Sequence, residues 1–176
     1  MEILDALHPQ DVLVRVPARA KRPLLEVLAR RLASRSGVSA VSVLSALLGR
    51  EKLGATSIGQ GIGMPHAMLD GLQEPAAVLA VLEAPIPYDA PDDQSVDVVL
   101  AVIWPRNGST DFLTALARFC RRLSDPQVLR QLRGSASPEE AVRHLRDPGD
   151  AACPTIAGLS ALAAPRSRAA ARGSWR

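Results

Sequence analysis

The sequence has few aromatic residues, no long apolar run and only two cysteines, and each shortage excludes a class of protein. Phe, Trp and Tyr make up 3% of the 176 residues, so Leu, Val, Ile and Ala must fill the core. No apolar run approaches the ~20 residues that a membrane-spanning helix needs, and the N-terminal residues lack the basic and apolar regions of a secretory signal. Cys120 and Cys153 form neither a CxxC motif nor a disulfide framework. These absences predict a cytoplasmic protein without a membrane span.

Basic charge is in excess, and the excess is confined to the end of the chain. The formal net charge is +3 at pH 7. Residues 1–145 contain 16 Lys and Arg against 16 Asp and Glu, whereas residues 146–176 contain 5 Arg against 2 Asp, which accounts for the whole excess. Apart from Trp175 the basic tail has no interleaved aromatic side chains. We therefore expect no specific nucleic-acid partner.

Hydrophobic spacing predicts helices before, between and after short strands. Apolar residues recur at helical spacing in five stretches, residues 22–35, 39–48, 111–123, 125–132 and 137–146. Ser39 is the predicted N-cap of the second helix, and Gly49 is placed to end it. Two short Val-rich runs, residues 76–82 and 96–103, have the texture of buried strands, and residues 85–93 are predicted to form a loop between them. This order predicts an α/β or α+β layer fold.

The same signals divide the chain into a domain and a tail. The helical and strand patterns end near Arg146. Residues 147–176 are rich in Ala, Pro, Gly, Ser and Arg, a composition typical of disorder. We therefore expect one folded domain over residues 1–146 and a disordered tail over residues 147–176.

A glycine-rich stretch over residues 54–66 ends in the sequence Met64-Pro65-His66. Four glycines within ten residues favour tight turns, leave room for a bulky group and allow backbone N–H groups to face an anion. Proline fixes its own φ and keeps Met64 extended, so the backbone that enters His66 is stiff. An imidazole held in this way suits a phosphoryl acceptor, because it is neutral near pH 7, nucleophilic and a reversible leaving group.

Spacing alone leaves a structural, hydrogen-bonding role for His66 as an alternative. Metal ligation has little support, because nothing nearby repeats a ligand spacing. A nucleotide site is also disfavoured. The stretch lacks the Gly-Lys-Ser/Thr ending of a P-loop, and residues 59–64 break the GxGxxG pattern. We expect neither a metal nor a cofactor.

Residues 50–66, which begin Arg50-Glu51 and end Pro65-His66, resemble the active-site signature of type-2 EIIA domains of the phosphotransferase system, the mannitol/fructose class. Further similarity lies in residues 85–90, 92–97 and 121–125, so that the resemblance covers roughly residues 5–146. Residues 85–90 and 92–97 are most similar to the nitrogen-regulatory branch. The resemblance implies a mixed sheet of about five strands flanked by helices.

The resemblance also implies roles for individual residues. His66 is the expected phosphoryl acceptor, taking the group from the phosphohistidine of HPr or an HPr-like carrier, at Nε2. Arg50 matches the arginine that neutralises phosphoryl oxygens, a role that suits guanidinium geometry. Thr56, Ser57 and Gly63 are the expected phosphoryl-binding positions, although a turn-forming role fits Thr56 and Ser57 equally well.

One position departs from the family pattern. The family has a second histidine near the start of the helix that follows the last long strand, and Phe112 stands there in this sequence. Asp111 is one position away and does not replace that contact. The departure predicts slower transfer, a less stable phosphorylated form, or a site that has drifted toward signalling.

Three functions remain in view at this point. The first is a phosphohistidine carrier of the nitrogen-regulatory type, a phosphotransferase whose phosphorylation state controls partner proteins. The second is a sugar-uptake EIIA that passes the phosphoryl group to an EIIB domain of a fructose or mannitol transporter. The third is a binding module that keeps the EIIA fold without catalysis.

Overall fold

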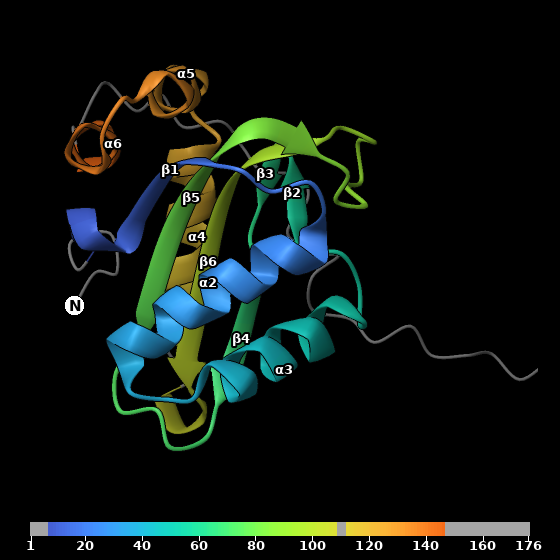
Figure 1. Ribbon diagram of the computed structural model, residues 1–176, viewed down its shortest axis with the longest axis vertical. Coiled ribbons are helices and arrows are strands. Elements are labelled where there is room, and N and C mark those ends of the chain that lie inside the picture. The colour runs from blue at the N-terminus through green and yellow to red at the C-terminus, as the bar shows by residue number, and fades with distance from the viewer. Residues whose placement is uncertain (1–6, 109–111, 147–176) are drawn as a thin grey trace, which may run out of the picture.

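The computed structural model describes residues 7–108 and 112–146, and within them a mixed sheet of six strands is flanked by five α-helices (Figure 1). The strands are β1 Val12–Val16, β2 Ser57–Gly59, β3 Ile62–Gly63, β4 His66–Leu69, β5 Ala76–Ile86 and β6 Val96–Pro105. The helices are α2 Lys21–Ser36, α3 Ala40–Glu51, α4 Phe112–Leu123, α5 Pro126–Gly134 and α6 Pro138–Arg146, with short 3-10 turns at Pro9–Asp11 and Arg106–Gly108. The predicted fold of a mixed sheet between helices is confirmed, with one strand more than expected.

The strand order places two short strands end to end beside one long strand. The sheet runs β1-β5-β6-β3-β2, and β4 also pairs with β6. The long strands β5 and β6 are antiparallel, whereas β3 and β4 both run parallel to β6. Met64 and Pro65 separate β3 from β4, and the carbonyl of Pro65 still accepts a hydrogen bond from the amide of Val102 at 2.9 Å. The backbone that delivers His66 is therefore supported by the central strand.

Two layers of helices bury the two faces of the sheet. In Figure 1, α2 and α3 cover one face, α4 lies behind the other, and α5 and α6 lie at one end of the sheet. Along β6, Leu100 and Val102 face the core shared with α4, α5 and α6, while Ala101 and Ile103 face α2 and α3. All four are fully buried. Each buried Leu, Val or Ile contributes about 1.5–3 kcal/mol to folding, so the scarcity of aromatic residues does not weaken the core.

Two predicted boundaries were wrong, and both elements are longer than expected. Ser39 does cap α3, with its hydroxyl accepting from the amide of Ser42 at 3.1 Å, but the helix continues through Gly49 to Glu51. A helical glycine costs only about 1 kcal/mol, and the amide of Lys52 still bonds to the carbonyl of Leu48 at 3.2 Å. Strand β5 likewise runs on to Ile86, which pairs with Val96, so residues 85 and 86 are not loop.

The glycine-rich stretch forms a tight turn, as predicted, but this turn joins two short strands, β2 and β3, that were not expected. Its turn contains Gly59, Gln60 and Gly61, all with positive φ. The guanidinium of Arg133, from α5, holds this turn: it donates to both carboxylate oxygens of Asp97 at 2.8 Å and to the carbonyl of Gln60 at 2.9 Å. The turn that precedes Met64 and His66 is thus tied to α5 and to β6.

The Gly61→Ala substitution is expected to destabilise the protein by about 1–3 kcal/mol. A Cβ there would lie 2.6 Å from Arg133 Nη2 and 2.9 Å from Asp97 Oδ1, and φ is +79°. Urea unfolding measures the cost. The matched control is Gly71→Ala, which has φ +77° but open space around the Cβ, so that it reports backbone strain alone. Equal costs for the two variants would show that the Arg133 contact does not matter.

Among the described residues, no helix combines the length and the apolar character that crossing a membrane requires. The predicted tail, residues 147–176, lies outside the described residues.

Candidate functional site

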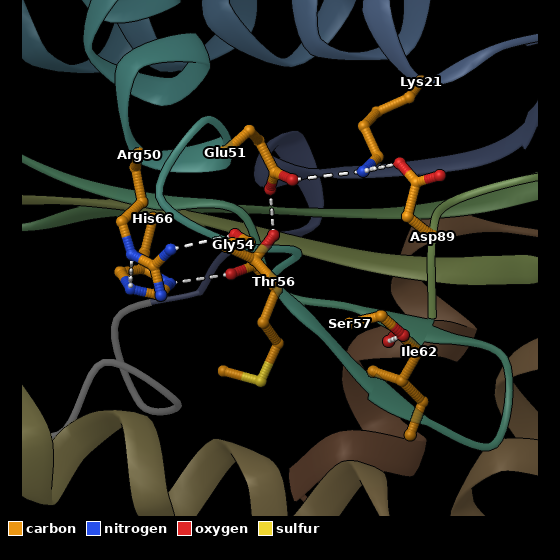
Figure 2. Close-up of polar contacts among 10 residues, drawn as sticks. Lys21, Arg50, Glu51, Gly54, Thr56, Ser57, Ile62, His66 and Asp89 are labelled. Carbon is orange, nitrogen blue, oxygen red and sulfur yellow. Dashed lines mark hydrogen bonds and ion pairs between the residues drawn. The ribbon is translucent and has the colours of Figure 1, made fainter. Parts of the chain in front are cut away.

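His66 is the first residue of β4, and both of its ring nitrogens have partners. Nδ1 lies 2.8 Å from the carbonyl oxygen of Met64, and Nε2 lies 3.1 Å from Nε of Arg50 (Figure 2). A guanidinium N–H can only donate, so Nε2 must be the acceptor and the ring proton must be on Nδ1. Nδ1 then donates to Met64. The site therefore presents the Nε2 lone pair beside a permanent cation.

Arg50 is the penultimate residue of α3, and it is held where the helix meets the turn that follows. Its Nη1 donates to the carbonyl of Gly54 at 3.1 Å, in addition to the bond from Nε to His66. The extra helical residues beyond Gly49 place Arg50 at this end of α3. Figure 2 draws the guanidinium of Arg50 next to the imidazole of His66, with the hydrogen bond between them as a dashed line. The pairing of these two predicted residues is the central geometric feature of the site.

The surroundings of His66 favour its neutral form. Burial lowers the pKa of His66 below its ordinary value of 6.5, the carbonyl of Met64 opposes this effect, and the charge of Arg50 adds to it. Glu51 acts in the opposite direction. Because the net direction is downward, the imidazole stays unprotonated at neutral pH and its Nε2 can act as a nucleophile.

The lowered pKa predicts an acid limb that lies below that of an ordinary histidine. Protonation of His66 occupies the Nε2 lone pair and stops any reaction there. Since the pKa is depressed, we expect the reactivity of His66 to persist as the pH falls through 6.5 and to decline only at lower pH. Titration of the His66 ring signals by NMR, beside those of a histidine in an unstructured peptide, measures this shift. A midpoint at or above that of the peptide would contradict the argument.

A second polar network, centred on Glu51, connects the site to three other segments. The Glu51 carboxylate accepts a hydrogen bond from the hydroxyl of Thr56 and pairs with the ammonium of Lys21 at 3.2 Å (Figure 2). Lys21 also pairs with Asp89 at 3.0 Å and lies 4.2 Å from the centre of the Tyr88 ring. The carbonyl of Thr56 accepts from the amide of Met64 at 2.8 Å. This network ties the first residue of α2 and the end of α3 to the backbone that carries His66.

The three predicted phosphoryl-binding positions lie in the hairpin, where each already has structural contacts. Thr56 is buried and its hydroxyl donates to Glu51. The hydroxyl of Ser57 donates to the carbonyl of Ile62 at 2.8 Å, across the hairpin. Gly63 is buried, and a Cβ there would lie 3.2 Å from the Tyr88 ring. Of these three described residues, only Ser57 has a side chain that bonds across the hairpin. The role of all three toward a phosphoryl group stays a prediction.

Sequence reasoning did not identify Lys21 and Glu51 as part of the site. Glu51 could have been identified from its position directly after Arg50 in the stretch that resembles the EIIA signature. Lys21 offered no signal, because its contact with Glu51 depends on how α2 packs beside α3. Phe112 was singled out only as a departure from a family pattern; its ring centre lies 5.7 Å from that of His66. Asp111, the neighbouring candidate, lies outside the described residues.

The arrangement suits the capture of an electrophile that carries negative charge. The neutral Nε2 lone pair of His66 lies directly against the Arg50 guanidinium. The imidazole can therefore attack an electrophile while the adjacent cation neutralises its negative charge. Within residues 7–108 and 112–146, no cluster of three His, Cys, Asp or Glu side chains is arranged to hold a metal ion.

Comparisons with known proteins place the chain in a family. The family model described as phosphoenolpyruvate-dependent sugar phosphotransferase system, EIIA 2, matches residues 5–147. The nitrogen regulatory protein of Bradyrhizobium diazoefficiens is 36% identical over 135 residues, which are 77% of this chain and 88% of that protein. The crystal structure of nitrogen regulatory protein IIA-Ntr from Neisseria meningitidis superposes with a TM-score of 0.78 at 26% identity, covering 81% of this chain and 98% of that one.

A more distant structure has the same fold. IIA mannitol from Escherichia coli superposes with a TM-score of 0.69 at 20% identity, over 79% of this chain and 98% of that one. Together, the family match over most of the chain and the similarity to nitrogen regulatory proteins decide the assignment. The chain belongs to the EIIA 2 family of the phosphoenolpyruvate-dependent sugar phosphotransferase system.

Proposed function

We propose that this protein is a phosphohistidine carrier of the nitrogen-regulatory type, which accepts a phosphoryl group on His66 and controls partner proteins through its phosphorylation state. The observation that carries the proposal is the 3.1 Å contact between Arg50 Nε and His66 Nε2, with Nδ1 held by Met64. Because Met64 holds Nδ1, only Nε2 is presented to an incoming phosphoryl group.

The transfer step follows from this geometry. The Nε2 lone pair attacks the phosphorus of a donor phosphohistidine, the new Nε2–P bond forms, and the donor's N–P bond breaks with its electron pair returning to the donor nitrogen. Before the attack, this lone pair accepts a hydrogen bond from Arg50. The guanidinium must therefore move from Nε2 onto the phosphoryl oxygens, where charge develops. The Nδ1 proton stays on the ring, bonded to Met64. No metal, oxidant or cofactor enters the balance.

Exposed apolar side chains near the site support a protein as the phosphoryl donor. Leu53 is 84% exposed and precedes Gly54, whose carbonyl binds Arg50. Leu113 is 70% exposed and follows Phe112, whose ring contacts His66. Each of these exposed apolar side chains is adjacent in the sequence to a residue that contacts the site, and a partner that approached His66 could cover them. An HPr-like carrier is the donor that this surface and the family suggest.

The names of the relatives favour regulation over sugar uptake. The similar protein of Bradyrhizobium diazoefficiens is a nitrogen regulatory protein, and the more similar of the two structures is IIA-Ntr. Under the alternative, the chain would pass its phosphoryl group to an EIIB domain. A non-catalytic binding module would not need Nε2 to face a guanidinium, and the observed contact therefore weighs against it.

Incubation with phosphoenolpyruvate, enzyme I and HPr, or their nitrogen-branch counterparts, tests the proposal. We expect the intact mass to rise by one phosphoryl group under mildly alkaline conditions that preserve phosphohistidine, and ³¹P NMR to identify an Nε2 adduct. Omission of HPr is the control and should prevent the gain. Addition of a purified fructose or mannitol EIIB then separates regulation from uptake, because only an uptake protein loses its phosphoryl group rapidly to EIIB. No mass gain with donors that phosphorylate another EIIA protein would overturn the proposal.

A further inference from the structure

Two aromatic rings, those of Phe112 and Trp104, lie in a row with the imidazole of His66. The ring centre of Phe112 is 5.7 Å from that of His66, with the planes inclined at 52°. The ring centre of Trp104 is 5.6 Å from that of Phe112, with an inclination of 59°. Tilted contacts at these separations are favourable for aromatic pairs. Phe112 is thus held by the sheet on one side and holds His66 on the other.

The three contacts of His66 come from three different parts of the fold. Met64, between β3 and β4, takes the Nδ1 proton; Arg50, from α3, faces Nε2; and Phe112, the first residue of α4, contacts the ring itself. The two hydrogen bonds restrain the imidazole at its nitrogens only. Phe112 supplies an apolar contact to the ring, and only 5% of its own surface is exposed.

We propose that Phe112 is a positioning residue for His66: its ring keeps Nε2 directed at Arg50 and shields the phosphorus–nitrogen bond from water once His66 carries a phosphoryl group. The shielding part rests on the proposed function. The positioning part concerns the unphosphorylated ring and stands without it.

The chemistry of the phosphorus–nitrogen bond explains why an apolar neighbour matters. In hydrolysis, water attacks phosphorus, the P–N bond breaks and its electron pair returns to Nε2, with the water's proton passing to solvent. Water that can reach the bond, and polar groups that can orient it, speed this loss. Within residues 7–108 and 112–146, the charged groups that act on His66 are Arg50 and Glu51, both from α3. From α4 the described contact comes from the hydrocarbon ring of Phe112, which cannot donate a hydrogen bond to water or accept one as a polar group does.

The alternative is that Phe112 only fills the core. Phe119 makes a matched comparison, because it is the other phenylalanine of α4, belongs to the same core cluster and is 1% exposed. No aromatic contact between Phe119 and His66 is found in the part of the chain that the structure describes. Loss of either ring perturbs the same core, but only loss of Phe112 should change the pKa and the tautomer of His66.

The experiment compares wild type, Phe112→Ala, Phe112→Val, Phe119→Ala and Phe119→Val, all in the full chain. NMR of the ring nitrogens reports the tautomer and the pKa of His66 before phosphorylation. Potassium phosphoramidate, a small-molecule donor, then phosphorylates the protein without any carrier, and ³¹P NMR follows the decay of phosphohistidine. We expect both Phe112 variants to raise the pKa of His66 toward 6.5, to weaken the preference for the Nδ1–H tautomer and to shorten the phosphohistidine lifetime several-fold, with Ala exceeding Val. The Phe119 variants should match wild type in all three.

The inference is overturned if the folded Phe112 variants keep the wild-type pKa, tautomer and decay rate, or if the Phe119 variants change them equally. The Phe112→Val and Phe119→Val variants remove less of the core, so their comparison tests the positioning role where an Ala variant does not fold. Failure of His66 to accept phosphate from both phosphoramidate and the protein donors would instead sink the proposed function and the shielding. The tautomer and pKa measurements would then still decide the positioning role.

Discussion

Replacing His66 with glutamine is expected to abolish phosphorylation of the chain by an HPr-like donor. The amide of glutamine can still hydrogen-bond to Arg50, but it has no nucleophilic nitrogen, because its lone pair is delocalised. His66 is the histidine whose Nε2 faces a guanidinium at 3.1 Å. Intact mass after incubation with the complete donor system measures the effect, and we expect no gain for the variant.

The other two histidines serve as matched controls for this prediction. His8 precedes the 3-10 turn at Pro9–Asp11, and His144 lies on α6, 3.6 Å from Glu140. We expect His8→Gln and His144→Gln to be phosphorylated to the same extent as wild type. Residual phosphorylation of His66→Gln, or its loss in either control, would place the phosphoryl group elsewhere.

Replacing Arg50 with methionine is expected to slow phosphoryl transfer to His66 by about 10²–10³-fold, the usual cost of removing a donor that stabilises charge in the transition state. Methionine keeps an unbranched stem and a high helical propensity, while removing the bonds to His66 Nε2 and Gly54. Quenched-flow measurement of the transfer rate tests this. Arg50→Lys should recover only part of the rate, because an ammonium lacks the planar fork of a guanidinium.

Lys52→Met is the matched control for Arg50, because it removes a cation two positions away on an exposed side chain. We expect its transfer rate to remain close to that of wild type at physiological salt. If Lys52→Met slowed transfer as much as Arg50→Met, Arg50 would act through general attraction of the negatively charged donor and not through its contact with His66. A normal rate for Arg50→Met would remove Arg50 from the mechanism.

Local parts of the fold were predictable because they depend on neighbours in the sequence. Ser39 caps α3 and Asp125 caps α5 through bonds to amides within three residues. The hairpin at Gly59–Gly61 follows from glycines that accept positive φ. The end of α3 was not predictable in this way: a glycine cost of about 1 kcal/mol is small against tertiary contacts, such as those that Arg50 and Glu51 make beyond Gly49.

By itself, the sequence determined that His66 follows a rigid Pro65, that a glycine-rich turn precedes it, and, through the resemblance, that Arg50 is its partner. Only the tertiary structure decided which atoms meet. The assignment of the proton to Nδ1, the link from Lys21 through Glu51 to Thr56, and the contact of Phe112 with the imidazole all join separate elements. The physical reason is that capping and turn formation involve residues a few positions apart, whereas these contacts depend on how α2, α3 and α4 pack against one sheet.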